Sequence, residues 1–200
     1  ITDLLLLRGD KAKSDNRFIP TPDGHAHAID LCQQINRFNN GQLLGGVQNE
    51  MLTEPFTYGV AGYPEKHDEA MNMETDIENL KAKVNAGAQY IVTQMFFDNS
   101  KYFAFVKRLR KEGINVPVIP GLKPLTTLNH LTMLPKTFHI DFPKRLSNEL
   151  MKCKSNDDVK AVGVEWAKHQ CRELRENGVP GIHFYTMNAS QSVEKIMNGL

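Results

Sequence analysis

Residues Tyr58–Asp98 read YGVAGYPEKHDEAMNMETDIENLKAKVNAGAQYIVTQMFFD and predict a strand, a loop, a helix and a second strand. The apolar run Tyr58–Ala61 predicts the first strand, and Gly62 with the following Tyr-Pro pair ends it. A second buried-type strand is expected over Tyr90–Thr93, with Gln94 at its carboxyl end. Because a helix joins the two strands, we expect a βαβ unit whose strands are parallel.

The helix of this unit is expected to begin near Glu65 or His67 and to end at Gly87, a residue type that favours the position after a helix. Its charges suit the helix dipole. The acids come early and the lysines late, namely Glu65, Asp68 and Glu69 against Lys81 and Lys83.

Two stripes run along this helix. The apolar stripe, expected to face the sheet, is Ile77, Leu80 and Val84. The polar stripe, with the same spacing one position earlier, is Asp76, Asn79 and Lys83. The pattern leaves two interpretations open: the polar stripe is a solvated flank, or it is a polar wall for a ligand that lies over the strand ends.

Strands and helices alternate five times along the chain. Strands are expected over residues 3–7, 58–61, 90–93, 118–119 (cut short by Pro120-Gly121) and 182–185, and helices over 25–38, 65–86, 100–112, 126–134, 144–153, 157–177 and 190–197. Repeated βα units give a parallel sheet, either open and doubly wound or closed as a barrel. The phosphate-binding patterns GxGxxG and GxxxxGK[ST] are absent, which argues against a Rossmann sheet.

The length of 200 residues suits one domain, and the charge is nearly balanced, with 24 basic and 23 acidic side chains. No basic block points to nucleic acid or to an anionic membrane, and no run is long enough to span one. Three dispersed cysteines and the absence of a histidine ligand pattern argue against a disulfide framework and a metal site. We therefore expect a cytoplasmic protein without a bound metal.

The chain begins at Ile1 and enters the apolar run Leu4–Leu7 almost at once. A buried strand with nothing before it predicts that the chain is N-terminally truncated.

The stretches GVAGYPEKHDEA (59–70) and DIENLKAKVNAGAQYIVTQMFFD (76–98) resemble the signature region of the methylenetetrahydrofolate reductase family. Three further stretches agree in order: LLLLRGD (4–10), VPVIPGLKP (116–124) and GIHFYTMN (181–188). Each motif alone is unspecific, but together they are specific and span nearly the whole chain.

This resemblance implies a flavin-dependent, bacterial-type catalytic domain with the (β/α)8 TIM-barrel fold. Residues 1–200 would form a single barrel domain that lacks its N-terminal part and supplies the C-terminal two-thirds, about the last five βα units. The family's general acid, a glutamate on the first strand, would lie upstream of Ile1, so the fragment alone is expected to be inactive.

The resemblance also implies site residues. The positions that match FAD contacts are Arg8, Gly9, Asp10, His27, Ala28, Tyr63, His67, Ala70, Asp76, Asn79 and Lys83. Asp10 would act electrostatically, disfavouring anionic reduced flavin and stabilising a cationic folate intermediate, and Gln94 would contact the pterin and the nicotinamide in turn.

Simpler interpretations stay open for four of these residues. Asp10 can cap a turn, Tyr63 can pack on Pro64, His67 can cap a helix, and Gln94 can bond to loop backbone. The chain also departs from the family at two positions to which we assign no role: His130 stands where a glutamine is frequent and Ala189 where some members have an arginine.

The implied activity is the FAD-dependent reduction of 5,10-methylenetetrahydrofolate to 5-methyltetrahydrofolate with NADH or NADPH, in one-carbon metabolism and methionine synthesis. The intact protein would be a homo-oligomer that binds folate and a nicotinamide nucleotide. Two alternatives remain open: another flavin-dependent TIM-barrel oxidoreductase, or a non-catalytic nucleotide-binding or regulatory fragment.

Overall fold

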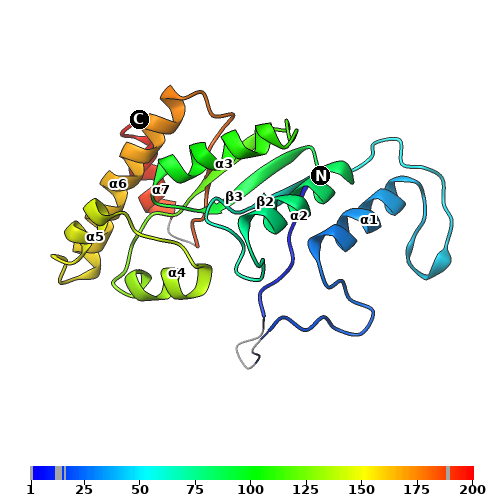
Figure 1. The fold of residues 1–200 in the computed structure, drawn as a ribbon, viewed down its shortest axis with the longest axis horizontal. Coiled ribbons are helices and arrows are strands. Elements are labelled where there is room, and N and C mark those ends of the chain that lie inside the picture. The colour runs from blue at the N-terminus through cyan, green and yellow to red at the C-terminus, as the bar shows by residue number, and fades with distance from the viewer. Residues whose placement is uncertain (1, 12–14, 16, 188–189) are drawn as a thin grey trace.

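The computed structural model describes residues 2–11, 15, 17–187 and 190–200. Its five strands form one parallel sheet (Figure 1), and they are β1 (Asp3–Leu6), β2 (Thr57–Gly62), β3 (Tyr90–Met95), β4 (Val118–Leu122) and β5 (His183–Phe184). Each strand pairs with the next one along the chain, so the order is β1-β2-β3-β4-β5. A doubly wound sheet would reverse its order at a switch point. The sequential order therefore selects the barrel-type sheet of the two that the sequence allowed.

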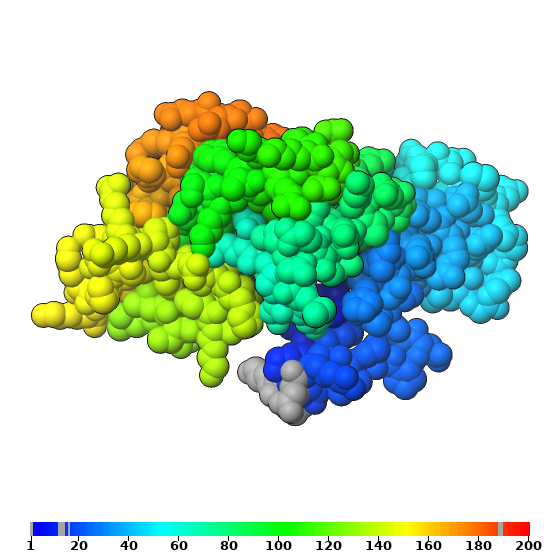
Figure 2. All heavy atoms as spheres, in the orientation of Figure 1, coloured from blue at the N-terminus to red at the C-terminus, as the bar shows by residue number. Residues whose placement is uncertain are grey.

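Helices fill the connections between the strands, and a last helix follows β5. They are α1 (Ala28–Asn39), the short 3-10 helix η1 (Leu44–Gly46), α2 (Met73–Asn85), α3 (Asn99–Lys111), α4 (His130–Phe138), α5 (Lys144–Leu150), α6 (Asn156–Glu176) and α7 (Ser190–Met197). In the orientation of Figure 2, α2 and α3 lie on the middle of the surface that faces the viewer. None of the described helices combines the length and apolar character that crossing a bilayer requires.

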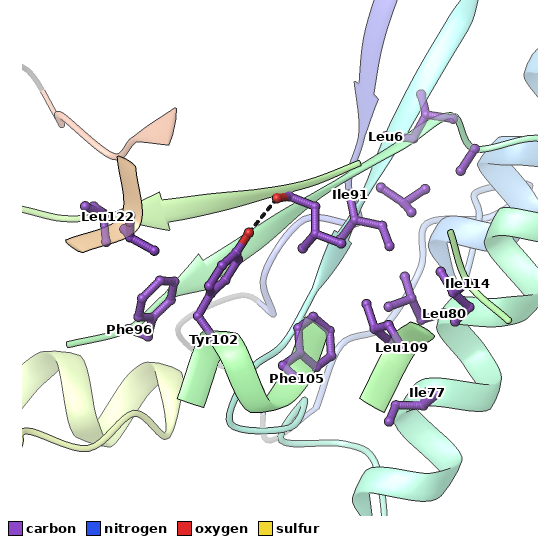
Figure 3. Packing of buried hydrophobic residues seen from close by; sticks show 14 of the residues in the cluster. Leu6, Ile77, Leu80, Ile91, Phe96, Tyr102, Phe105, Leu109, Ile114 and Leu122 are labelled. Atoms are coloured by element: carbon purple, nitrogen blue, oxygen red, sulfur yellow. Dashed lines mark hydrogen bonds between the residues drawn. The ribbon is translucent and has the colours of Figure 1, made fainter. Parts of the chain in front are cut away.

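The main core lies between the sheet and its helices. Figure 3 shows strand residues such as Leu6 and Ile91 with helix residues such as Leu80 and Leu109, all buried in one cluster. Tyr102 on α3 adds a directed contact, because its hydroxyl donates to the Val118 carbonyl oxygen at 2.7 Å. The predicted apolar stripe of α2 is confirmed, since its members Ile77 and Leu80 are each 3% exposed.

The predicted start of α2 was wrong. The helix begins at Met73, and the Asn72 side chain caps it by accepting from the Thr75 backbone N–H at 2.8 Å. An asparagine cap satisfies one of the free N–H groups of the first turn. The early acids Glu65 and Glu69 therefore belong to the loop after β2, where they are free to bond to distant segments.

The predicted early end of β4 was also wrong, because the strand continues through Pro120 to Leu122. Pro120 has no N–H to give, and pairing with β3 shifts register beside it, between Val92 and Met95. The Gly121 N–H donates instead to the Thr93 hydroxyl at 2.9 Å. A side chain thus replaces a main-chain acceptor at this irregularity. Helix α4 likewise differs: it begins at His130 and runs to Phe138, through a stretch predicted as a connection.

Gly163 on α6 is expected to be required for close packing. A Cβ atom at this position would overlap the backbone oxygen of Leu125, in the segment after β4. Gly163→Ala should therefore lower the free energy of unfolding by about 1–3 kcal/mol, the usual range for overpacking. Helix propensity alone would raise it by about 1 kcal/mol, so the two effects have opposite signs. Urea unfolding measures the change, and Ala161→Gly on the exposed side of the same helix calibrates the propensity effect.

Candidate functional site

Arg8 and Glu69 join the carboxyl ends of β1 and β2. The Arg8 guanidinium donates through Nη1 and Nη2 to the two oxygens of Glu69, at 2.7 and 2.8 Å. This paired bond raises the pKa of Arg8 and lowers the pKa of Glu69, which His67 and His27 lower further. Three predicted cofactor residues, Arg8, His27 and His67, therefore surround one carboxylate that the sequence did not single out.

Tyr63 directly follows β2 and contacts His67. Its ring contacts the His67 ring edge to face, with centroids 4.6 Å apart. Burial raises the pKa of Tyr63, and the negative charge of Asp76 raises it further. The phenol therefore stays protonated and can donate a hydrogen bond at neutral pH. The simpler interpretation, in which Tyr63 only packs on Pro64, is therefore incomplete, because the His67 ring also contacts Tyr63.

The loop between β2 and α2 is held by two buried or half-buried side chains. Asp76 accepts from the His67 backbone N–H at 2.9 Å. Lys66 donates to the carbonyl oxygens of His67 and Ala70, at 2.8 and 2.6 Å, and adopts a positive φ of 77°. These bonds fix where His67 and Ala70 stand relative to the strand ends. Lys66 was not predicted, because a lysine in a polar loop gives no signal in the sequence.

The polar stripe of α2 fits neither interpretation as a whole. Asp76 is 9% exposed and binds the loop, whereas Lys83 donates to the Ala61 carbonyl oxygen of β2 at 3.0 Å. Burial lowers the pKa of Lys83, while the charge of Asp76 acts in the opposite direction. Only Asn79 is exposed. Two members of the stripe thus hold the strand and loop beside the site, and one faces solvent.

The ends of β3 and β5 add an amide and a phenol. Gln94 accepts from the Met95 backbone N–H at 2.9 Å, and none of the described residues accepts a hydrogen bond from its NH2 group. Gln94 thus bonds to the backbone of its own strand β3, and not to a loop as the simpler interpretation had it. Tyr185 donates to the Thr93 carbonyl oxygen at 2.8 Å, and burial raises the pKa of Tyr185 to about 12.

Comparison with known proteins identifies the family. The family model described as methylenetetrahydrofolate reductase matches residues 1–200. The chain belongs to the methylenetetrahydrofolate reductase family. It is 34% identical over 199 residues to methylenetetrahydrofolate reductase 1 of Schizosaccharomyces pombe, covering 99% of this chain and 31% of the relative. It is 32% identical to methylenetetrahydrofolate reductase (NADH) 1 of Arabidopsis thaliana, covering 100% of this chain and 33% of the relative.

The chain spans about a third of the length of these two reductases. A solved structure supports the fold alone: it is an uncharacterized protein from Clostridium thermocellum, described as binding two copies of 5-methyl-5,6,7,8-tetrahydrofolic acid. It matches with a TM-score of 0.53 at 15% identity, over 94% of this chain and 65% of that protein. The predicted family and the partial TIM-barrel fold are confirmed.

The other predicted cofactor residues lie in the segment after β1 and at the start of α1. Asp10 and Gly9 follow β1 and are exposed, with open space around the Gly9 Cα. His27 precedes α1, and its backbone N–H donates to Asp30 at 2.9 Å. Ala28 is the first residue of α1. Ala189 lies outside the described residues.

Two further ionisable groups near the strand ends were not predicted as site residues. Glu65, 9% exposed at its side chain, pairs with Lys101 and accepts from the Asp141 backbone N–H at 3.1 Å. Burial raises its pKa. Lys123, directly after β4, is 8% exposed. A lysine at the end of an apolar strand was a usable signal, because lysine is seldom fully buried without a partner.

Proposed function

We propose that the protein to which this chain belongs reduces 5,10-methylenetetrahydrofolate to 5-methyltetrahydrofolate with FAD and NADH or NADPH. The observation that carries the proposal is the convergence of Arg8, Tyr63, His67 and Asp76 at the carboxyl ends of β1 and β2 in a member of this family. Active sites of barrel enzymes lie at this end of the strands. The description of the solved neighbour as a binder of 5-methyltetrahydrofolic acid favours a folate ligand.

The chemistry of the residues at this end fits a flavin dinucleotide. A guanidinium and an ammonium suit phosphate oxygens, and aromatic side chains suit a ring system. Arg8 already lies 4.5 Å from the Phe18 ring centroid, and the open space beside Gly9 leaves room for a close approach. The proposed FAD contacts are Arg8, Gly9, Asp10, His27, Ala28, Tyr63, His67, Ala70, Asp76, Asn79 and Lys83.

Bound FAD would supply the hydride transfer between nicotinamide and folate. Tyr63 offers a neutral donor, and Asp76 holds the His67 backbone in place. Asp10 places a carboxylate beside the strand ends, where it would stabilise positive charge on the folate. Gln94 would use its NH2 group to bind whichever ring occupies the site, because its oxygen already accepts from the Met95 N–H.

The cofactor is tested by its identity. We expect that heating the purified, full-length protein releases FAD, and that chromatography against standards shows no excess of FMN. Recovery of FMN alone would contradict the assignment, and a colourless protein that takes up neither flavin would favour the regulatory alternative. A homo-oligomeric state and a cytoplasmic location stay predictions.

A further inference from the structure

The chain turns back directly after β2, in a turn over residues 63–66. The Lys66 backbone N–H donates to the Tyr63 carbonyl oxygen at 3.2 Å, and Pro64 stands at the second turn position, which favours proline. Lys66 then adopts a φ of 77°, and the His67 ring comes back against the ring of Tyr63. Glu65 is the third residue of this turn, so whatever holds the Glu65 side chain also holds the turn and the two rings beside it.

The Glu65 side chain is held by α3. Its Oε2 accepts from the Lys101 ammonium, and it also accepts from the Asp141 backbone N–H at 3.1 Å. Its Oε1 is buried and has no hydrogen-bond partner among the described residues. Burial raises the pKa of Glu65, while the hydrogen bond and the charge of Lys101 act in the opposite direction. This carboxylate therefore depends on Lys101 for its compensation.

Lys101 has a second anionic partner, which matters less. Its Nζ donates to the Asp141 carboxylate at 2.8 Å, but that side chain is 80% exposed, and exposed ion pairs contribute little because water competes for both charges. The buried partner Glu65 is more sensitive. A buried carboxylate that loses its cation must take up a proton or move out to water. A movement of Glu65 to solvent would carry the turn 63–66 with it.

We propose that Lys101 is a positioning residue of the flavin site, because through Glu65 it fixes the turn 63–66 and with it the rings of Tyr63 and His67. Asp76 holds the turn from the α2 side, by accepting from the His67 backbone N–H at 2.9 Å. Side chains that are already fixed lose less freedom when a ligand binds, so this support should raise the affinity for the ligand. That the ligand is a flavin rests on the proposed function.

The first experiment does not depend on flavin. Hydrogen exchange in the peptide that covers residues 63–70 is followed by mass spectrometry in the full-length protein freed of flavin. Lys101→Met should speed this exchange by about tenfold or more, as expected for one lost bond to a charged group, and Lys101→Arg should stay within about threefold of the unaltered protein. The matched control is Lys107→Met, at an exposed position of the same helix, which should change nothing. Exchange unchanged by Lys101→Met would overturn the proposal.

The second experiment measures flavin affinity, by titrating FAD into the same proteins and following the quenching of flavin fluorescence. Lys101→Met should weaken binding by about tenfold or more, and Lys101→Arg by less than about threefold. Asp141→Asn should change binding by less than about twofold, because its carboxylate is exposed.

A double substitution tests whether Lys101 acts through Glu65. In a Glu65→Met protein, adding Lys101→Met should weaken FAD binding by less than about twofold further, because the carboxylate that the ammonium holds is gone. A further tenfold loss in this background would refute the route through Glu65. If the unaltered protein binds no flavin, the proposed function fails, whereas the exchange measurement still decides whether Lys101 holds the turn.

Discussion

Leu109→Ala is expected to lower the free energy of unfolding by about 2–5 kcal/mol, the usual cost of truncating a fully buried leucine. Leu109 is 0% exposed and belongs to the core cluster between α3 and the sheet (Figure 3). The loss combines the removed apolar surface with a cavity that rigid neighbours cannot fill. For a domain of this size it corresponds to a decrease in Tm of about 4–20 °C, measurable by thermal and urea unfolding.

Leu128→Ala is the matched control for this truncation. Leu128 is 39% exposed in the segment before α4, so the same chemical change should alter stability by only about 0.5 kcal/mol. Equal losses at the two positions would mean that the cluster around Leu109 is not the part of the molecule that holds the sheet and helices together.

Asp10→Asn is expected to slow folate reduction far more than reduction of the flavin by nicotinamide. A carboxylate that faces a developing cation stabilises the transition state of the folate half-reaction only. Losing one such electrostatic interaction typically costs about 2–4 kcal/mol, or about 30- to 1,000-fold in rate. Asp10 is exposed at the end of β1, so the substitution should leave the fold intact. Stopped-flow spectroscopy of each half-reaction in the full-length protein measures the two rates.

Asp23→Asn provides the same charge change in the same polar segment, and it should leave both rates unaltered. Asp23 is exposed with a φ of 61°, a conformation that asparagine also tolerates. Equal slowing of both half-reactions by Asp10→Asn would show instead that Asp10 affects flavin binding or the local fold.

Local sequence patterns predicted the elements well where one physical cause dominates. The apolar stripe of α2 and the glycine after it are confirmed. A buried helix face requires apolar residues at regular spacing, and a positive φ (120° at Gly87) favours glycine, so both can be recognised in the sequence. The start of α2 was mispredicted because Pro64 and the acids after it are residue types typical of a helix start. The boundary is set instead by the Asn72 side chain, which caps the helix. The strand through Pro120 was missed because it continues by a shift in register, where the Gly121 N–H donates to the Thr93 hydroxyl of the neighbouring strand.

The sequence by itself determined the family, the alternation of strands and helices, and most of the residues at the carboxyl ends of the strands. Only the tertiary structure decided that Glu69 binds Arg8, across 61 residues, and that Lys83 holds the Ala61 carbonyl rather than facing outward. It also decided that Lys123, directly after β4, is buried. The reason is physical: periodicity records which face of an element is buried, whereas the partner of a charge depends on which distant segments the parallel sheet brings to the same edge.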